Sequence, residues 1–430
     1  MTASSASTHG LPPPSAQTGA LSHIRVLDLS RVLAGPWCTQ NLADMGADVI
    51  KIEKPGAGDD TRHWGPPYLD GDDGPTRQAS YFAACNRNKR SVTVDIATPE
   101  GQKLVRELAA QSDVVIENYK TGGLKRYGLD YEALSALNPR LIYCSITGFG
   151  QTGPYAARPG YDLLVQAMSG LMSITGQPDG EPGAGPLRVG VAVIDVFTGM
   201  YATTAIMGAI EARHHTGRGQ RIDIALLDVA MAVLANQGAG YLNAGVVPTR
   251  QGNAHPSVVP YQDFPTHDGD MLLAIGNDGQ FARFCEVADV DWARDDRYAT
   301  NSARVTHRAT LIPMMSEITR KKPTREWIAL LEAASVPCGP INDIGQAFAD
   351  EHVQHRGLRV EQYRYAASEQ PEADSVNRIC TTASPLRLSE TPPTLRHAPP
   401  ALGQHTDEVL RDCLGLDRQA VADLRAKGVL

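Results

Sequence analysis

Short apolar runs alternate with helix-length amphipathic segments along the first half of the chain. Strand-like runs occupy residues 24–30, 48–55, 90–96, 113–118 and 140–148. Helical patterns follow at 34–47, entered through Gly35 and Pro36, and at 98–113, where Thr98 is an expected N-cap and Pro99 the first helical residue. Strands separated by helices predict an α/β fold built on a parallel sheet with right-handed crossovers.

Ligands of such sheets bind outside the carboxyl ends of the strands. We therefore expect the loops at 30–36, 53–62 and 117–123 to line one crevice. Farther along, residues 191–194 predict a short strand that ends in a turn at Asp195, ahead of a helix that stops before Gly217. Burial would raise the pKa of Asp195 and a helix N-terminus would lower it, which leaves a weakly hydrated carboxylate suited to nucleophilic attack. A simple helix-capping aspartate is the alternative.

The second half of the chain predicts a separate domain. A length of 430 residues exceeds what one core usually serves, and Gly, Pro and Asn are enriched from about 238 to 260. We assign residues 21–237 and 353–430 to a large domain, 238–352 to a linker and a smaller α+β domain that opens with a hairpin around Asp268, and 1–20 to a disordered tail.

Composition narrows the function classes. A formal net charge of −8 disfavours a general nucleic-acid binder. The seven cysteines are scattered and include no C-x-x-C pair, so they suggest neither a disulfide framework nor a metal site. This cysteine pattern fits a protein of the reducing cytoplasm. The start of the chain lacks the pattern of a signal peptide, and we expect no membrane span.

The turn at 30–36 has one glycine, so the dinucleotide fingerprint is missing although Glu53 occupies a plausible ribose-binding position. Cys38 near a helix start suggests a thiol nucleophile, but core packing is the stronger interpretation.

Several long segments carry a resemblance to a known family. They span residues 24–62, 86–101, 113–131, 145–176, 194–228 and 400–410. From Leu21 to Leu430 the sequence resembles the family III CoA-transferases (the CaiB/BaiF family), which include formyl-CoA transferase and carnitine CoA-transferase. The resemblance implies a large Rossmann-like domain, a smaller α+β domain and a homodimer whose two chains are interlinked like rings.

The resemblance also implies a mechanism. The family's nucleophilic aspartate matches Asp195, which would form a mixed anhydride with the acyl group of an acyl-CoA and then an aspartyl-CoA thioester that a carboxylic acid attacks. Such chemistry requires exclusion of water and donors for the oxyanion, and backbone N–H groups near Gly199 are our hypothesis for one donor. The CoA thioester is then a substrate, and no permanently bound cofactor or metal is expected.

The family's CoA contacts carry over by motif to seven residues of this chain: Val32, Ala34, Lys54, Asn118, Tyr119, Gly123 and Arg126. Lys54 and Arg126 would supply positive charge for phosphates, and Tyr119 would supply an aromatic face for the adenine. Three further cations, Arg87, Lys89 and Arg90, either add to this local field or form a plain surface cluster.

Two departures from formyl-CoA transferase concern the substrate. Leu33 stands where that enzyme has glutamine, and residues 253–264 stand where it has a run of glycines. The loop from His255 to Pro260 is more similar to that of members that use succinyl-CoA or other dicarboxyl-CoA substrates. The expected partners are therefore such an acyl-CoA and a small carboxylic acid acceptor.

Two rival functions remain. The α-methylacyl-CoA racemases share the family fold, but their catalytic histidine matches Tyr161, and tyrosine is a poor base at neutral pH. A protein that only binds acyl-CoA is the non-catalytic alternative. Deuteration at the α-carbon without an acceptor acid would favour the racemase, and loss of exchange on replacing Asp195 would favour the transferase.

Overall fold

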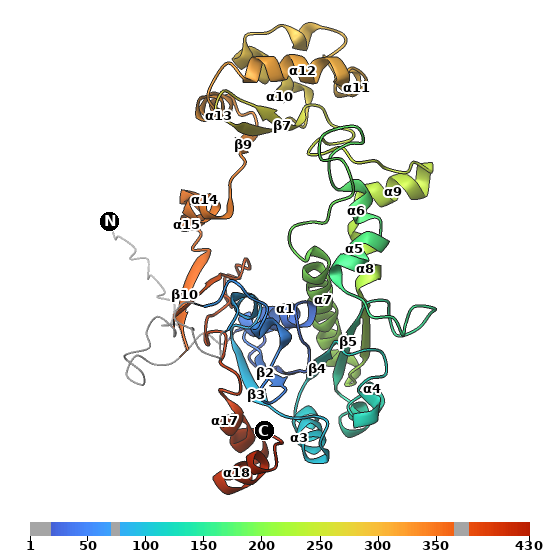
Figure 1. The fold of residues 1–430 in the computed structure, drawn as a ribbon, viewed down its shortest axis with the longest axis vertical. Coiled ribbons are helices and arrows are strands. Elements are labelled where there is room, and N and C mark those ends of the chain that lie inside the picture. Colours follow the sequence, from blue (N-terminus) through green and yellow to red (C-terminus); the bar gives the residue numbers. More distant parts are fainter. Residues whose placement is uncertain (1–18, 70–77, 365–377) are drawn as a thin grey trace, which may run out of the picture. The chain divides into compact units, whose positions relative to one another are not determined.

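The chain forms two compact units in the computed structural model, which describes residues 19–69, 78–364 and 378–430 (Figure 1). The first unit comprises the described residues of Met1–Val165, Gly190–Val233 and Gly357–Leu430, and the second comprises Gln166–Val189 and Leu234–Arg356. Residues 166–189 were expected in the large domain, whereas they group with the second unit. Most of the expected N-terminal tail lies outside the described residues.

A six-stranded sheet forms the centre of the first unit. Its order is β3-β2-β1-β4-β5-β6 and every neighbouring pair is parallel, as the alternation of strands and helices predicts. The strands are β1 (Arg25–Asp28), β2 (Asp48–Glu53), β3 (Lys89–Thr93), β4 (Val114–Glu117), β5 (Ile142–Thr147) and β6 (Arg221–Ala225).

Helices cover both faces of this sheet because successive strand residues point to opposite sides. Leu27, Ile50 and Val115 face a core shared with α3, α4 and two C-terminal helices. The long helix α7 packs against α1, β5 and β6. The bounds of these helices are α1 (Ala34–Asp44), α3 (Pro99–Ala110), α4 (Tyr131–Leu137), α7 (Val193–Thr216), α17 (Thr406–Leu414) and α18 (Arg418–Ala426).

Local signals explain several element boundaries. The Thr98 hydroxyl accepts a hydrogen bond from Gly101 N–H at 3.0 Å, so Thr98 is the N-cap that the sequence predicts for α3. Gly217 ends α7 in the left-handed conformation, with φ of 70°. The remaining elements of the first unit are α2 (Ser80–Ala83), α5 (Asp162–Met168, which runs into the second unit), α8 (Leu226–Val233) and the antiparallel pair β10 (Arg359–Tyr363) and β11 (Arg378–Thr382).

One expected strand is wrong. Residues 191–194 do not join the sheet, because α7 already begins at Val193 and places Asp195 in its first turn. Apolar residues at 191, 193 and 194 fit either a short strand or the start of a buried helix, and periodicity cannot separate the two over so few positions.

The second unit contains an antiparallel sheet of order β7-β8-β9. The expected hairpin around Asp268 is present as the turn between β7 and β8. The core of the second unit buries Phe264, Phe281 and Trp327. The first residues of the linker expected from about 238 to 260 belong to a helix instead, because α9 runs from Ala235 to Ala244. The elements are α6 (Leu171–Ile174), α9 (Ala235–Ala244), β7 (Tyr261–Pro265), β8 (Asp270–Ala274), α10 (Asp278–Ala288), α11 (Asn301–Thr306), α12 (Arg308–Thr319), α13 (Thr324–Ala333), β9 (Cys338–Pro340), α14 (Ile344–Ala349) and α15 (Glu351–His355).

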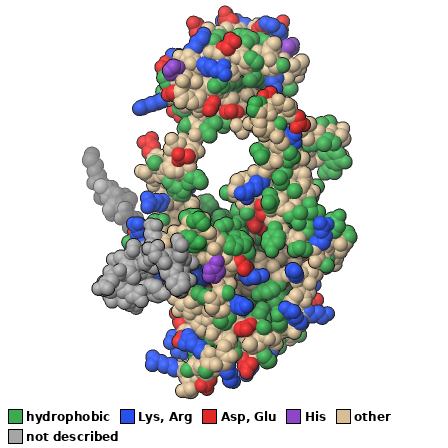
Figure 2. Space-filling view, viewed as in Figure 1, with side chains coloured by type: hydrophobic (Ala, Val, Ile, Leu, Met, Phe, Trp, Pro, Cys, Tyr) green, Lys and Arg blue, Asp and Glu red, His purple; other side chains and the backbone are tan. Residues whose placement is uncertain are grey.

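The surface of the described residues mixes charges of both signs. On the face drawn in Figure 2, Lys and Arg side chains are interspersed with Asp and Glu side chains. Among the described helices, α7 alone is long and apolar enough to cross a membrane, a feature that the sequence analysis overlooked. Its buried positions, which include Ile194, Ile206 and Ile210, also fit the core helix of a folded unit. The expectation of no membrane partner stays a prediction.

The crossing of α1 and α7 depends on Gly199. A Cβ atom at this position would lie 2.7 Å from the carbonyl oxygen of Ala34 and 3.0 Å from the Trp37 side chain. Since any side chain at Gly199 would push the helices apart, glycine is required by close approach rather than by backbone conformation.

We expect Gly199→Ala to lower the free energy of unfolding by about 1–3 kcal/mol because the methyl group overpacks the crossing. Gly208→Ala is the matched control, since nothing lies within 4 Å of a Cβ atom at Gly208 in the same helix. The control should be neutral or stabilising by up to about 1 kcal/mol, as for glycine in any helix interior. Denaturant titration of both variants measures the difference, and equal effects would contradict the role given to Gly199.

Candidate active site

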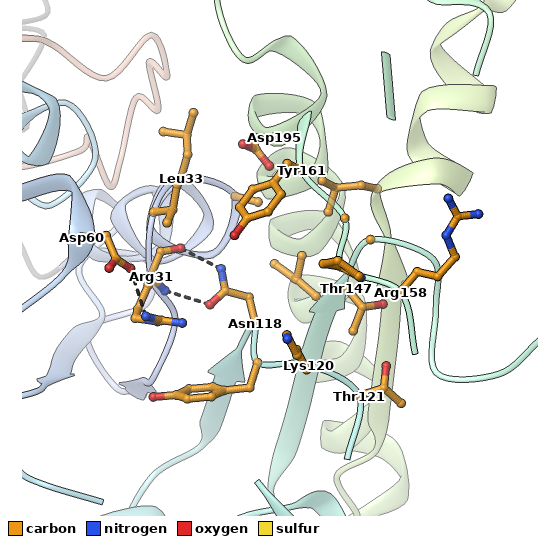
Figure 3. A pocket seen from close by; sticks show the side chains of 18 of the residues that line it. Arg31, Leu33, Asp60, Asn118, Lys120, Thr121, Thr147, Arg158, Tyr161 and Asp195 are labelled. Carbon is orange, nitrogen blue, oxygen red and sulfur yellow. Dashed lines mark hydrogen bonds and ion pairs between the residues drawn. The ribbon is translucent and has the colours of Figure 1, made fainter. Parts of the chain in front are cut away.

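A pocket opens at the carboxyl edge of the six-stranded sheet, beside the neighbouring strands β1 and β4. The order of the strands reverses at this point, which is where open α/β sheets bind their ligands. The pocket has a volume of about 340 Å³ and is lined by the loops after β1, β4 and β5 and by the first turns of α1 and α7 (Figure 3). The three loops expected at one crevice therefore all contribute to this pocket: 30–36, 117–123 and, through Asp60, 53–62.

Asp195 projects into this pocket from the first turn of α7 (Figure 3). Its position follows from the helix crossing. Asp195 and Gly199 are four residues apart and so share one face of α7. Because Gly199 contacts the backbone of Ala34, the preceding turn brings Asp195 close to the loop that carries Leu33.

A second carboxylate lies beside the first turn of α7. Asp162 accepts hydrogen bonds from the backbone N–H groups of Ile194 at 2.8 Å and Asp195 at 3.2 Å. It therefore caps α7 from another segment of the chain, although Ala192, the residue before the helix, provides no side-chain cap. Burial, and then the negative charge of Asp162, raise the pKa of Asp195 to about 7.

The first loop of the pocket has a strained backbone. Val32 adopts φ of 68°, a left-handed conformation that a β-branched residue rarely tolerates. Its N–H group donates to both carboxylate oxygens of Asp59, each at 3.2 Å. Asn118 makes two hydrogen bonds with the backbone of Arg31, the residue before Val32. The Arg31 N–H group donates to the Asn118 side-chain oxygen at 2.9 Å, and the Asn118 side-chain amide donates to the Arg31 carbonyl at 2.7 Å. Polar side chains from two other loops thus hold this turn.

Buried charges lie directly behind this turn. Lys51 is fully buried, pairs with Asp59 at 2.9 Å and donates to the Ser30 carbonyl at 2.9 Å. Lys89 is also fully buried and pairs with Asp28 at 3.1 Å. Burial opposes ionisation of Asp28, but the charges of Lys89 and Lys51 outweigh it and lower its pKa to about 2. Each charge in this layer therefore depends on its partners, because an unpaired charge in the interior is costly.

The expected CoA-binding residues divide between adjoining pockets. Val32, Ala34, Asn118 and Tyr119 line the pocket that contains Asp195. The second pocket has a volume of about 420 Å³, and it contains Lys54 and Arg126. The two pockets share three lining residues, Arg31, Asp60 and Tyr119, so they border one another in the same unit. Gly123 lies in a third, smaller pocket beside the same loop.

The structure overturns two hypotheses about binding groups. The N–H group of Gly199 lies in the second turn of α7, where the helix uses backbone N–H groups internally, so it does not point at an oxyanion. Arg87 and Lys89 do not contribute a field for phosphates, since both are buried and pair with Asp44 and Asp28. Arg90 pairs with Asp48 at 2.7 Å. All three cations stabilise the fold instead.

The two remaining sequence candidates are structural. Burial raises the pKa of the Cys38 thiol to about 12, which removes it as a nucleophile at neutral pH. Glu53 forms a buried two-point ion pair with Arg62, at 2.7 and 2.8 Å, and accepts from the Ser91 hydroxyl at 2.6 Å. Its carboxylate is thus engaged inside the unit rather than presented to a ribose.

Sequence reasoning missed several residues of the pocket. Arg31 and Arg158 of this pocket, and Asp59 of the adjoining one, follow strands of the sheet, and that position alone was the available signal. Tyr161 was considered only as the substitute for a histidine, and it is largely exposed in the pocket wall. The contact between Asp162 and α7 could not have been predicted, because Asp162 lies 33 residues before Asp195 in the chain and meets α7 only in the folded unit.

A family model matches most of the chain. The model described as CoA-transferase family III aligns with residues 21–406. The chain belongs to this family. It is a family III CoA-transferase, and coenzyme A thioesters are the substrates of such enzymes.

Two relatives of this CoA-transferase are named for succinate or succinyl-CoA and for glutarate. A succinate–glutarate CoA-transferase of Agrobacterium fabrum is 52% identical over 401 residues, which cover 93% of this chain and 97% of that protein. The human succinyl-CoA:glutarate CoA-transferase is 43% identical over 411 residues, which cover 95% of this chain and 90% of that protein. A solved CaiB/BaiF family protein of Brucella suis matches with a TM-score of 0.80 and 46% identity, over 92% of this chain and all of that one.

The backbone strain at Val32 yields a test of the pocket's first loop. Asp59→Ala leaves Lys51 buried without its partner, and we expect the free energy of unfolding to fall by about 3–5 kcal/mol. Val32→Gly removes a left-handed strain of about 1–2 kcal/mol. If Asp59 holds the strained turn, its loss lets Val32 relax, so Val32→Gly should add less stability in the Asp59→Ala background than it adds to the unaltered protein. A double-mutant cycle by denaturant titration measures this coupling, and strictly additive effects would refute it.

Proposed function

We propose that this CoA-transferase moves CoA from succinyl-CoA to a small dicarboxylic acid such as glutarate, with Asp195 as the covalent carrier. The observation that supports the mechanism most directly is the Asp195 carboxylate, partly withdrawn from water in a pocket shared with four of the expected CoA-binding residues. The names of the relatives support succinyl-CoA and glutarate as the substrate pair.

The reaction proceeds through two anhydrides and one thioester. A carboxylate oxygen of Asp195 attacks the thioester carbonyl of succinyl-CoA, and the CoA thiolate leaves, which forms a mixed anhydride. The thiolate then attacks the Asp195 carbonyl carbon of the anhydride, which releases succinate and forms the aspartyl-CoA thioester. The acceptor carboxylate attacks this thioester and displaces the thiolate again. Attack of the thiolate on the acceptor's carbonyl releases the new acyl-CoA and restores Asp195.

The environment of Asp195 suits this chemistry. Burial weakens the hydration of its carboxylate, so less solvation is lost when an oxygen attacks the thioester. No side chain caps α1, whose first residue Ala34 lines the same pocket. In place of Gly199, we propose the first backbone N–H groups of α1 as the donors that stabilise the developing oxyanion.

The assembly and the location of the enzyme remain proposals. The family resemblance supports a homodimer with interlinked chains, and light scattering of the purified protein would test the dimeric state. It operates, in our proposal, in the cytoplasm and without a permanently bound cofactor.

We expect Asp195→Asn to abolish exchange between succinyl-CoA and labelled succinate while leaving the fold intact, because an amide cannot form the anhydride. Hydroxylamine added to the unaltered enzyme with succinyl-CoA should convert Asp195 to a hydroxamate, which mass spectrometry of the peptide detects. Circular dichroism of the variant controls for folding. Full exchange activity in Asp195→Asn, or the absence of any adduct at Asp195, would refute the mechanism.

The raised pKa of Asp195 predicts a pH dependence. Only the ionised carboxylate attacks, so kcat/KM should rise with pH through a midpoint at about 7 and level off above it. Asp162→Asn removes the neighbouring negative charge but keeps an oxygen that accepts from both capped N–H groups. It should therefore lower the pKa of Asp195 and move the rise in kcat/KM to lower pH.

The control for this shift is Asp60→Asn, which removes a carboxylate of the same pocket that pairs with Arg31. Its pH profile should keep its midpoint, because Asp60 does not act on the pKa of Asp195. A profile of Asp162→Asn that coincides with that of the unaltered enzyme would contradict the assignment.

A further inference from the structure

The pocket that contains Asp195 has three cationic side chains in its wall: Arg31, Lys120 and Arg158 (Figure 3). Arg31 is engaged by Asp60 at 3.0 Å. Within residues 19–69, 78–364 and 378–430, no carboxylate lies within ion-pair distance of Lys120 or Arg158. These two cations are therefore available to an anionic group of a substrate.

Arg158 is held by aromatic rings rather than by acidic side chains. Its guanidinium carbon lies 4.4 Å from the ring centre of Tyr155 and 5.5 Å from that of Phe149, and the two rings meet edge to face at 5.6 Å. A guanidinium that stacks on aromatic rings keeps in-plane N–H groups for a bidentate contact with a carboxylate. The arrangement orients the cation without neutralising it.

The position of Arg158 associates it with the acyl group rather than with the nucleotide. It belongs to the segment between β5 and α5 that also carries Tyr161, and this segment leads into Asp162, the first residue of α5, which caps α7 at Asp195. It does not line the adjoining pocket of Lys54 and Arg126. Lys120 differs, because it follows Tyr119 in the loop of expected CoA contacts and also lines the third pocket with Gly123.

A dicarboxylic acyl group brings a second carboxylate that stays ionised throughout the reaction. Bringing that charge into the pocket costs free energy unless a cation receives it. The acid released and the acid accepted react at Asp195 in turn, so one cation of the same pocket serves both.

We propose that Arg158 binds the distal carboxylate of the acyl group and of the acceptor acid, and thereby selects dicarboxylic substrates. This inference rests on the proposed function and adds to it the residue that determines acid specificity.

The test compares Arg158→Gln with the unaltered full-length enzyme. We expect kcat/KM for glutarate, at saturating succinyl-CoA, to fall about 10- to 100-fold, which corresponds to the loss of a charged hydrogen-bonded contact. The Kd of free CoA, measured by calorimetry, should stay within about twofold, because free CoA carries no distal carboxylate. Arg158→Lys should recover part of the loss, since it restores the charge without the planar fork.

Arg218→Gln is the matched control, since it removes an exposed arginine outside the pocket. It should change neither quantity by more than about twofold, as for most surface substitutions. If Arg158→Gln weakens free CoA by the same factor as it lowers kcat/KM, Arg158 is a CoA contact and the proposal is wrong. An unchanged kcat/KM for glutarate also overturns it.

Failure of the proposed function gives a different result. An unaltered enzyme that transfers CoA only to monocarboxylic acids would refute the proposed substrate class and this inference together. An unaltered enzyme that is active on glutarate, with an equally active Arg158→Gln variant, would refute the inference alone.

Discussion

The close contact between α1 and α7 at Gly199 is the constraint on which the site depends. The crossing leaves no room for a Cβ atom, since the Ala34 carbonyl oxygen would lie only 2.7 Å away. One turn earlier on the same face, the crossing sets Asp195 against the loop that carries Leu33. A helix contact made deep in the unit thereby decides where the Asp195 carboxylate meets the expected CoA-binding residues.

Charges that are withdrawn from water dominate the carboxyl edge of the sheet. Two buried lysines, Lys51 and Lys89, are paired with Asp59 and Asp28, and this layer holds the strained turn at Val32. Asp195 differs from these paired residues. The charge that acts on its pKa is that of another carboxylate, Asp162, rather than that of a cation. The buried lysines and aspartates are thus paired, whereas Asp195 has a raised pKa and no cation within ion-pair distance among the described residues.

Sequence patterns predicted much of this architecture. Periodicity and turn chemistry predicted the order of strands and helices and the cap at Thr98. The expected crevice at the loops after β1 and β4 is present, and Asp195, which the family motifs single out, lies in it. The strand expected at 191–194 was wrong because four apolar residues fit a buried helix start equally well. The basic segment at Arg87 and Lys89 was open to both interpretations, since burial does not appear in a string of residue types.

By itself, the sequence determined the α/β fold, the family and the identity of the candidate nucleophile. These properties depend on local propensity and on motifs that are contiguous in the chain. Only the tertiary structure decided that Asp162 caps α7 and shifts the pKa of Asp195, that Gly199 serves helix packing, and that Arg158 remains without an acidic partner among the described residues. The physical reason is that burial, pairing and close contact are properties of residues that meet across long separations in the chain, and no local pattern encodes them.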